Sequence, residues 1–235
     1  MSMLADHCPP ELVIFDVDGT LHDTFAWWAP IIRAGVARFA EQNQMQIDLP
    51  GVREAEAVVG MKDAGVWAPF LPDGHKDRWY DLRSVVLPME VEEVSRGVDY
   101  LFAGVRQMLP HLREIGVKVA LASNCRSEYM AAMMEGQGLR ELSDWQFCLD
   151  SPGVESKTDM LREAQKASGA QRVVMVGDSL DHDIAGAQAV GWDSVLVQKG
   201  LYASAFSNAD HDIILKTLLK DRACQPPTYS IEQLQ

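Results

Sequence analysis

The segment LVIFDVDGT at residues 12–20 decides the fold, because it joins an apolar run to a cluster of polar side chains. Its first four residues are apolar and favour extended chain, which predicts a short buried strand over 12–15. Residues two apart in a strand project to the same side, so Asp16 and Asp18 are expected to present their carboxylates together where the strand ends. Gly19 then allows the backbone to turn sharply.

Four further short apolar runs follow the first one and are rich in Val, Leu and Ile; they cover residues 117–122, 147–149, 173–176 and 195–197. Helices are predicted between them, at about 98–115, 127–137, 158–168 and 183–190. Short strands that are apolar on both faces and alternate with helices are typical of a parallel sheet covered on each side. The predicted fold class is therefore α/β, with a doubly wound parallel sheet.

One stretch interrupts this alternation. Residues 25–96 carry no comparable strand signal and begin with apolar residues at helical spacing, and further helices are predicted near 52–58 and 79–86. We interpret 25–96 as an inserted, mainly helical cap domain, residues 1–24 and 97–222 as the core, and 223–235 as a loosely held tail. Four tryptophans of the cap (Trp27, Trp28, Trp67 and Trp79) could form its core or contact a ligand.

The composition excludes several classes of protein. The 235 residues carry a formal net charge of −13, which disfavours nucleic acid as a partner. No apolar run approaches the length of about 20 residues that crosses a bilayer, so no membrane association is expected. The N-terminal segment lacks the pattern of a secretory signal, and four widely spaced cysteines indicate free thiols, so we expect a cytoplasmic protein.

Two further polar positions follow predicted strands or begin predicted helices. Ser123 and Asn124 come directly after the run 117–122, where a hydroxyl and a backbone N–H could hold a phosphate oxygen, although such a pair is also common in turns and helix caps. Lys157 lies at the start of a predicted helix, where a cation could neutralise a phosphoryl group and the charge of an aspartate, although an isolated lysine is commonly a surface residue.

A second acidic turn follows the run 173–176. Asp178 could supply an oxygen ligand for Mg²⁺ beside Asp16 and the backbone carbonyl of Asp18. Asp183 could assist this site or cap the next helix, and Asp181 competes with it. A calcium-binding loop is excluded at Asp16, since Leu21 and Trp27 occupy the places of its required glycine and glutamate. In an acidic protein, Mg²⁺ and Lys157 would make the pocket locally positive.

Taken in order, residues 16–20, Ser123, Lys157 and the pair Asp178 and Asp183 resemble the four motifs of the haloacid dehalogenase superfamily, in its phosphatase branch with a helical cap. The resemblance implies a Rossmann-like core, a cap that closes over the site, and a phosphoaspartyl intermediate. It further implies these roles: Asp16 as nucleophile and metal ligand, Asp18 as general acid and base with its backbone at the metal, Gly19, Thr20, Ser123, Asn124 and Lys157 at the phosphate, and Asp178 and Asp183 at the metal. His22 and Thr158 depart from common patterns without removing a catalytic group.

The resemblance extends to phosphoglycolate phosphatases and their broad-specificity relatives, which implies a small phosphorylated metabolite as substrate. Lys62, in a predicted cap loop, could contact it, or could be a solvated surface lysine. Three alternatives stay open: a phosphonatase with Lys62 as Schiff-base lysine, a phosphomutase, and a non-catalytic binding protein on the same scaffold. The physiological substrate and the oligomeric state do not follow from the sequence.

Overall fold

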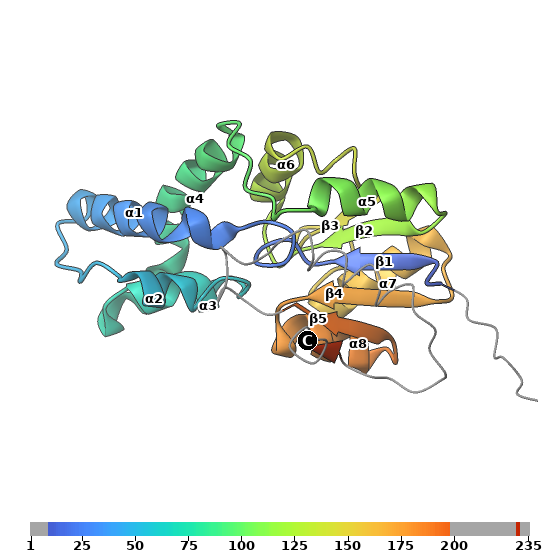
Figure 1. Cartoon of the computed structure of the whole chain (residues 1–235). Helices are drawn as coiled ribbons and strands as arrows, with labels where there is room; N and C mark the ends of the chain where they lie inside the picture. The colour runs from blue at the N-terminus through green and yellow to red at the C-terminus, as the bar shows by residue number, and fades with distance from the viewer. Residues whose placement is uncertain (1–8, 198–228, 231–235) are drawn as a thin grey trace, which may run out of the picture.

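The computed structural model describes residues 9–197 and 229–230, and within them a parallel sheet and a helical insertion lie side by side (Figure 1). The six-stranded sheet has the order β3-β2-β1-β4-β5-β6, with every neighbouring pair parallel. Its strands are β1 (Leu12–Phe15), β2 (Lys118–Ala122), β3 (Trp145–Phe147), β4 (Val173–Gly177), β5 (Asp193–Leu196) and β6 (Tyr229–Ser230). This arrangement confirms the predicted doubly wound α/β class.

Alternate residues of β1 enter two separate apolar clusters, which explains why the strand is apolar throughout. Val13 and Phe15 pack with α5 (Val105–Glu114) and α6 (Ser127–Gly136), whereas Leu12 and Ile14 pack with α7 (Lys157–Ser168) and α8 (Ala185–Ala189). Both faces of the sheet are therefore covered by helices, as a parallel sheet requires.

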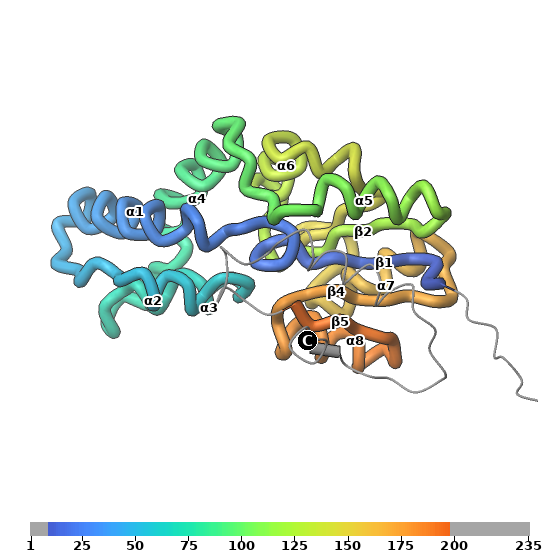
Figure 2. Tube along the Cα trace, in the orientation of Figure 1, coloured from blue at the N-terminus to red at the C-terminus, as the bar shows by residue number. Residues whose placement is uncertain are grey.

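The insertion is helical, as expected, and extends away from the sheet in the tube view (Figure 2). Its elements are η1 (Thr24–Ala26), α1 (Trp28–Gln42), α2 (Val52–Glu56), α3 (Ala64–Trp67), η2 (Ala68–Phe70), η3 (Asp73–Arg78) and α4 (Trp79–Ser95). Helix α4 continues nine residues beyond the predicted end at 86, because Pro88 is accommodated inside it. The apolar cluster that contains Val13 also extends through α1 and α4, so the cap and one face of the sheet share a core.

Other element boundaries also differ from the sequence prediction, and three of these differences have a clear local cause. Helix α5 begins at Val105 and not near 98, because residues 98–104 run beside the segment after β1, where the Phe102 N–H donates to the Leu21 carbonyl at 3.0 Å. Strand β3 ends at Phe147, since Cys148 turns away through a hydrogen bond to Ser151 Oγ. Before α8, residues 180–184 form a π-helical turn, η4 (Leu180–Ile184).

The ends of the chain are described only in part. Within the predicted tail, Tyr229–Ser230 forms the edge strand β6, a strand that the sequence did not predict; the rest of 223–235 lies outside the described residues. Cys125 and Cys148 are free thiols, and Cys8 and Cys224 lie outside the described residues. In the described part of the chain, no helix combines the length and the apolar character needed to span a bilayer.

Candidate active site

Asp16 lies directly after β1, at the carboxyl edge of the sheet, and is 5% exposed. Its N–H donates to the Val176 carbonyl at 2.8 Å, which anchors it beside β4. Gly19 adopts φ +81°, and a Cβ there would lie 2.5 Å from Asp178 Oδ2, so glycine is required on both conformational and steric grounds. The N–H groups of Gly19 and Thr20 donate to carbonyls within the same turn, those of His22 and Val17.

Lys157 reaches the same place from the first turn of α7, whose N-cap is Ser156. Its Nζ lies 2.7 Å from Asp16 Oδ1, 2.7 Å from the Ala122 carbonyl and 2.9 Å from Asp183 Oδ1. Burial lowers the pKa of the ammonium, but the two carboxylates outweigh this effect and raise it above its ordinary value. Lys157 is therefore a fixed positive charge at the end of β1.

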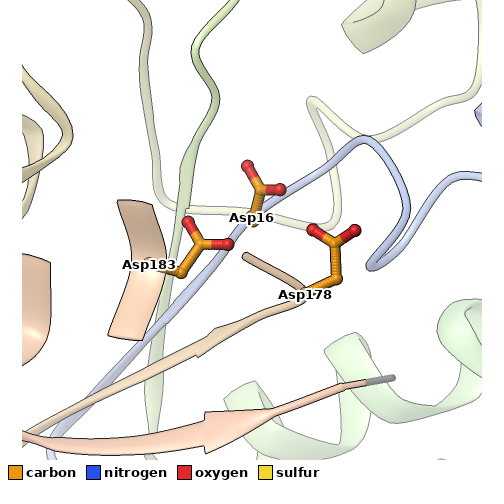
Figure 3. A group of neighbouring side chains, drawn as sticks. All are labelled: Asp16, Asp178 and Asp183. Atoms are coloured by element: carbon orange, nitrogen blue, oxygen red, sulfur yellow. The ribbon is translucent and has the colours of Figure 1, made fainter. Parts of the chain in front are cut away.

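Asp16, Asp178 and Asp183 point toward one another (Figure 3), and each offers a carboxylate oxygen within 4.8 Å of the others. All three are buried. Burial, followed by the charge of Asp183, raises the pKa of Asp16 well above its usual range despite the opposing charge of Lys157. Three buried carboxylates beside one ammonium carry an excess of negative charge, so the donor set fits a hard divalent cation.

The π-helical turn brings Asp183, and not Asp181, into this cluster. Asp183 is fully buried and accepts the Ser179 N–H at Oδ2, whereas Asp181 is exposed. A Cβ at Gly177 would lie 2.2 Å from Asp183 Oδ2, so only glycine lets this carboxylate approach the end of β4. Such π turns are frequent at functional sites.

Asp18 is surrounded by hydrogen-bond donors. Thr24 Oγ1 donates to its Oδ1 at 2.6 Å, Tyr129 OH donates to the same oxygen at 2.9 Å, and Ser123 Oγ donates to Oδ2 at 3.3 Å. Burial raises the pKa of Asp18, but His22 and the hydrogen bonds from Thr24 and Tyr129 outweigh it and hold the pKa below its ordinary value. The two aspartates at the end of β1 thus have opposite environments, one in an acidic cluster and one among donors.

Residues 10–191 match the haloacid dehalogenase-like hydrolase family, a span that covers strands β1 to β4, the helical insertion and every site residue described above. The chain belongs to this family. It is accordingly a hydrolase, and the predicted enzyme class and superfamily are confirmed.

Relatives of this hydrolase carry different names. It is 29% identical over 216 residues to the ribulose-1,5-bisphosphate 5-phosphatase of Halopiger xanaduensis, over 84% of this chain and 89% of that protein. It is 31% identical over 206 residues to the tyrosine-protein kinase PtkA of Mycobacterium tuberculosis; that match covers 81% of this chain but only 63% of the relative.

Solved structures share the fold at lower identity. A putative phosphoglycolate phosphatase from Lactobacillus delbrueckii aligns with a TM-score of 0.71 at 20% identity, over 91% of this chain and 100% of that one. CbbY from Rhodobacter sphaeroides, in complex with phosphate, aligns with a TM-score of 0.65 at 20% identity, over 83% of this hydrolase and 89% of CbbY.

A cavity of about 90 Å³ opens between the sheet edge and the cap of the hydrolase, and both Asp16 and Asp18 line it. Ser123 and Asn124 line it from the core, and Asn124 Nδ2 donates to the Gly60 carbonyl of the cap at 2.9 Å. Lys62 is not among the lining residues; its Nζ lies 3.2 Å from the Glu155 carbonyl. The loop at 60–63 therefore touches the core, while its lysine is turned to a backbone acceptor.

Two of the four cap tryptophans line the cavity, and two do not. Trp28 and Trp67 pack against each other with ring centroids 6.0 Å apart, and both also line the cavity. Trp28 Nε1 donates to the Ala55 carbonyl at 2.9 Å, which fixes its ring. Trp27 is buried and Trp79 packs against the apolar cluster, and neither lines the cavity.

Sequence reasoning missed several residues of the site, namely Thr24, Arg83, Glu90, Arg126 and Tyr129. Thr24 follows Asp18 closely and carried the only local signal, a hydroxyl within reach of the turn. Arg83 and Glu90 come from α4 of the cap and reach the cavity only because the cap docks on the core, whereas Arg126 and Tyr129 come from the start of α6, within the core.

Proposed function

We propose that this hydrolase is a magnesium-dependent phosphatase that cleaves small phosphate monoesters through a phosphoaspartyl intermediate on Asp16. The observation that carries the proposal is the pairing of Asp16, held by Lys157 in a buried acidic cluster, with Asp18, held by hydroxyl donors on the same cavity wall. Two carboxylates whose surroundings shift their pKa values in opposite directions suit the different roles of a nucleophile and a proton-transfer group.

Asp16, Asp178 and Asp183 would hold Mg²⁺, together with the backbone carbonyl of Asp18. When bound, the ion would neutralise charge on the phosphoryl oxygens and on the acidic cluster. Lys157 contributes a second, permanent positive charge to the same region, which explains how an anionic substrate can enter a protein with a formal net charge of −13.

In the first half-reaction, a carboxylate oxygen of Asp16 attacks phosphorus while the bond to the leaving oxygen breaks. Lys157 donates a hydrogen bond to Asp16 Oδ1, whereas Oδ2 does not take part in that hydrogen bond. Asp18 gives its proton to the leaving oxygen; the approach of a phosphate dianion raises the pKa of this carboxyl by like-charge repulsion, so that it can act as an acid.

In the second half-reaction, Asp18 takes a proton from water, and the water oxygen attacks phosphorus and releases Asp16 with inorganic phosphate. Ser123 and Asn124 are proposed to bind phosphate oxygens, as are Gly19 and Thr20. The N–H groups of the last two are engaged within the turn, so the hydroxyl of Thr20 is the group we expect to take part.

A small phosphorylated metabolite is the proposed substrate, as for the relative named a ribulose bisphosphate phosphatase. A cytoplasmic location and domain limits at 25–96 for the cap are part of the same proposal. The phosphonatase alternative requires Lys62 to reach the substrate, and its contact with the Glu155 carbonyl disfavours that role. A phosphomutase would return the phosphoryl group to a second hydroxyl, which product analysis detects.

The test measures inorganic phosphate release from p-nitrophenyl phosphate with MgCl₂, for the wild type and for Asp16→Asn. We expect the loss of at least about 10³-fold in kcat in the variant, since no nucleophile remains. The matched control is Asp73→Asn, an exposed cap position away from the cavity, which should match the wild type. A folded Asp16→Asn protein with full activity contradicts the mechanism. Incubation with labelled ATP and a tyrosine-containing peptide separates phosphate hydrolysis from tyrosine phosphorylation, the activity in the name of the kinase relatives.

A further inference from the structure

Glu90 is a buried acidic residue that the proposed chemistry does not use. It lies on α4 of the cap, is 4% exposed, and lines the same cavity as Asp16 and Asp18. Among the described residues its Oε1 has no hydrogen-bond partner. A buried, unsatisfied carboxyl oxygen destabilises a fold, so its presence needs an explanation.

The neighbours of Glu90 do not supply a structural role. The other charged cavity residue of α4 is Arg83, and its guanidinium is directed elsewhere: it lies 3.5 Å from Glu128 and over the ring of Tyr80. Glu93, one turn from Glu90 on the same helix, provides a contrast, because it accepts a hydrogen bond from Tyr100 and pairs with Arg96. Glu93 is satisfied by the fold, and Glu90 faces the cavity.

The surroundings of Glu90 indicate which kind of ligand group could hydrogen-bond to its side chain. Burial, and then the charge of Asp18, raise the pKa of Glu90 to about 8, while Arg83 opposes the shift. Near neutral pH the side chain is therefore mainly a carboxylic acid, which can both donate and accept a hydrogen bond. A hydroxyl group has the same dual capacity.

We propose that Glu90 is a specificity residue that recognises a hydroxyl on the leaving group, so that the substrates are phosphate esters of polyols or sugars. This inference rests on the proposed phosphatase function. The walls contributed by Trp28, Trp67 and Leu87 offer apolar faces to the C–H groups of a polyol.

The test compares two esters with four-carbon leaving groups, erythritol 4-phosphate and n-butyl phosphate, which differ only in hydroxyl groups. The readout is the ratio of their kcat/KM values. An analogue that leaves a buried polar group unpaired is expected to have a kcat/KM at least about 10-fold lower than that of the substrate that pairs it. We expect the wild type to favour erythritol 4-phosphate by that factor or more, Glu90→Gln to retain the preference within about 3-fold, and Glu90→Leu to reduce it by about 10- to 100-fold.

Glu93→Gln is the matched control, since this residue lies on the same helix but does not line the cavity, and its ratio should equal that of the wild type. An unchanged ratio in Glu90→Leu overturns the inference. Calorimetric binding of both esters to Asp16→Asn, with and without Glu90→Leu, gives an independent readout. If the wild type releases phosphate neither from p-nitrophenyl phosphate nor from these esters, the phosphatase proposal fails. Equal binding of the two esters to Asp16→Asn overturns the role of Glu90 separately.

Discussion

At the residue scale, the acidic cluster at the sheet edge carries more negative charge than its one lysine can neutralise. Asp16 follows β1, Asp178 follows β4 and Asp183 projects from η4, so separate segments bring three buried carboxylates within 4.8 Å of one another. Lys157 neutralises one of these charges. Like charges at this distance in a poorly hydrated site repel strongly, so the folded state is expected to gain stability when a cation binds.

We predict that MgCl₂ raises the thermal unfolding midpoint of the wild type, and that Asp178→Asn loses most of this gain. A ligand at a hundred times its Kd stabilises the folded state by about 2.7 kcal/mol, and removing one of three carboxylates weakens binding. The measurement is the unfolding midpoint in EDTA and in MgCl₂.

Asp181→Asn is the control for this prediction, because Asp181 is exposed and lies outside the cluster. It should retain the full gain. Equal gains for Asp178→Asn and the wild type would exclude the proposed ligand set, and a loss in Asp181→Asn would reopen the choice between Asp181 and Asp183.

Site residues that lie close to the end of an apolar run could be predicted from the sequence. Site residues that reach the cavity through the packing of helices could not. Asp16, Asp18 and Asp178 lie within three residues of the end of an apolar run, and parallel strands bring their carboxyl ends to one edge. Tyr129 and Glu90 lie on helices whose sequence pattern only indicates burial. Glu90 reaches the cavity because α4 docks on the core, and Tyr129 because α6 packs beside Asp18, and no spacing along the chain encodes either contact.

At the element scale, the junction of α4 with α6 joins the cap to the core through one close backbone contact. A Cβ at Gly136 would lie 2.1 Å from the Val94 carbonyl oxygen and 3.2 Å from Ser95 Cα. These are backbone atoms, which cannot rotate away. The small residue at the end of α6 therefore sets the distance between the two helices.

We predict that Gly136→Ala lowers the free energy of unfolding by about 1–3 kcal/mol, because the added methyl group forces the helices apart. Gly186→Ala is the control, since Gly186 is also helical, and a Cβ there would have its nearest contacts at 3.5 Å. That control should be neutral or slightly stabilising, as alanine is the better helix former. Urea denaturation measures both variants, and equal stabilities would contradict the close contact.

The limits of helices and strands were predicted well only where the sequence pattern around them is strong. Strand β1 was predicted at its observed limits because its apolar run is bounded by aspartate. The prediction for β3 was displaced by two residues, since this strand is only partly buried and its apolar pattern is weak. The start of α5 was wrong because residues 98–104 pair with the chain after β1, a contact between two segments that flank the cap.

At the scale of the whole molecule, the cap loop and the core are held together beside the cavity by one ion-pair network. Arg126 of the core pairs with Asp63 of the cap loop, and it also pairs with Asp150 at 2.7 Å. Asn124 adds its hydrogen bond to the Gly60 carbonyl. About a third of the Arg126 and Asp63 side chains is exposed, so solvent screens the pair and its contribution is modest.

We predict that Asp63→Asn lowers kcat/KM by about 2- to 5-fold at low salt, since an ion pair of this kind contributes up to about 1 kcal/mol to the contact between cap and core. The backbone accepts the change, because Asp63 has φ +49° and asparagine tolerates positive φ as well as aspartate does. The wild-type kcat/KM should fall toward that of the variant as NaCl is raised to 0.5 M, where charges are screened.

A double-mutant cycle separates the contact between cap and core from direct effects on the substrate, because Asp63 and Arg126 both line the cavity. Asp63→Asn, Arg126→Gln and the double variant should show a favourable coupling in kcat/KM that disappears at high salt. Asp73→Asn breaks an ion pair with Lys76 inside the cap and serves as the control without coupling to Arg126. Additive effects of the two substitutions at low salt would show that this ion pair does not hold the cap for catalysis.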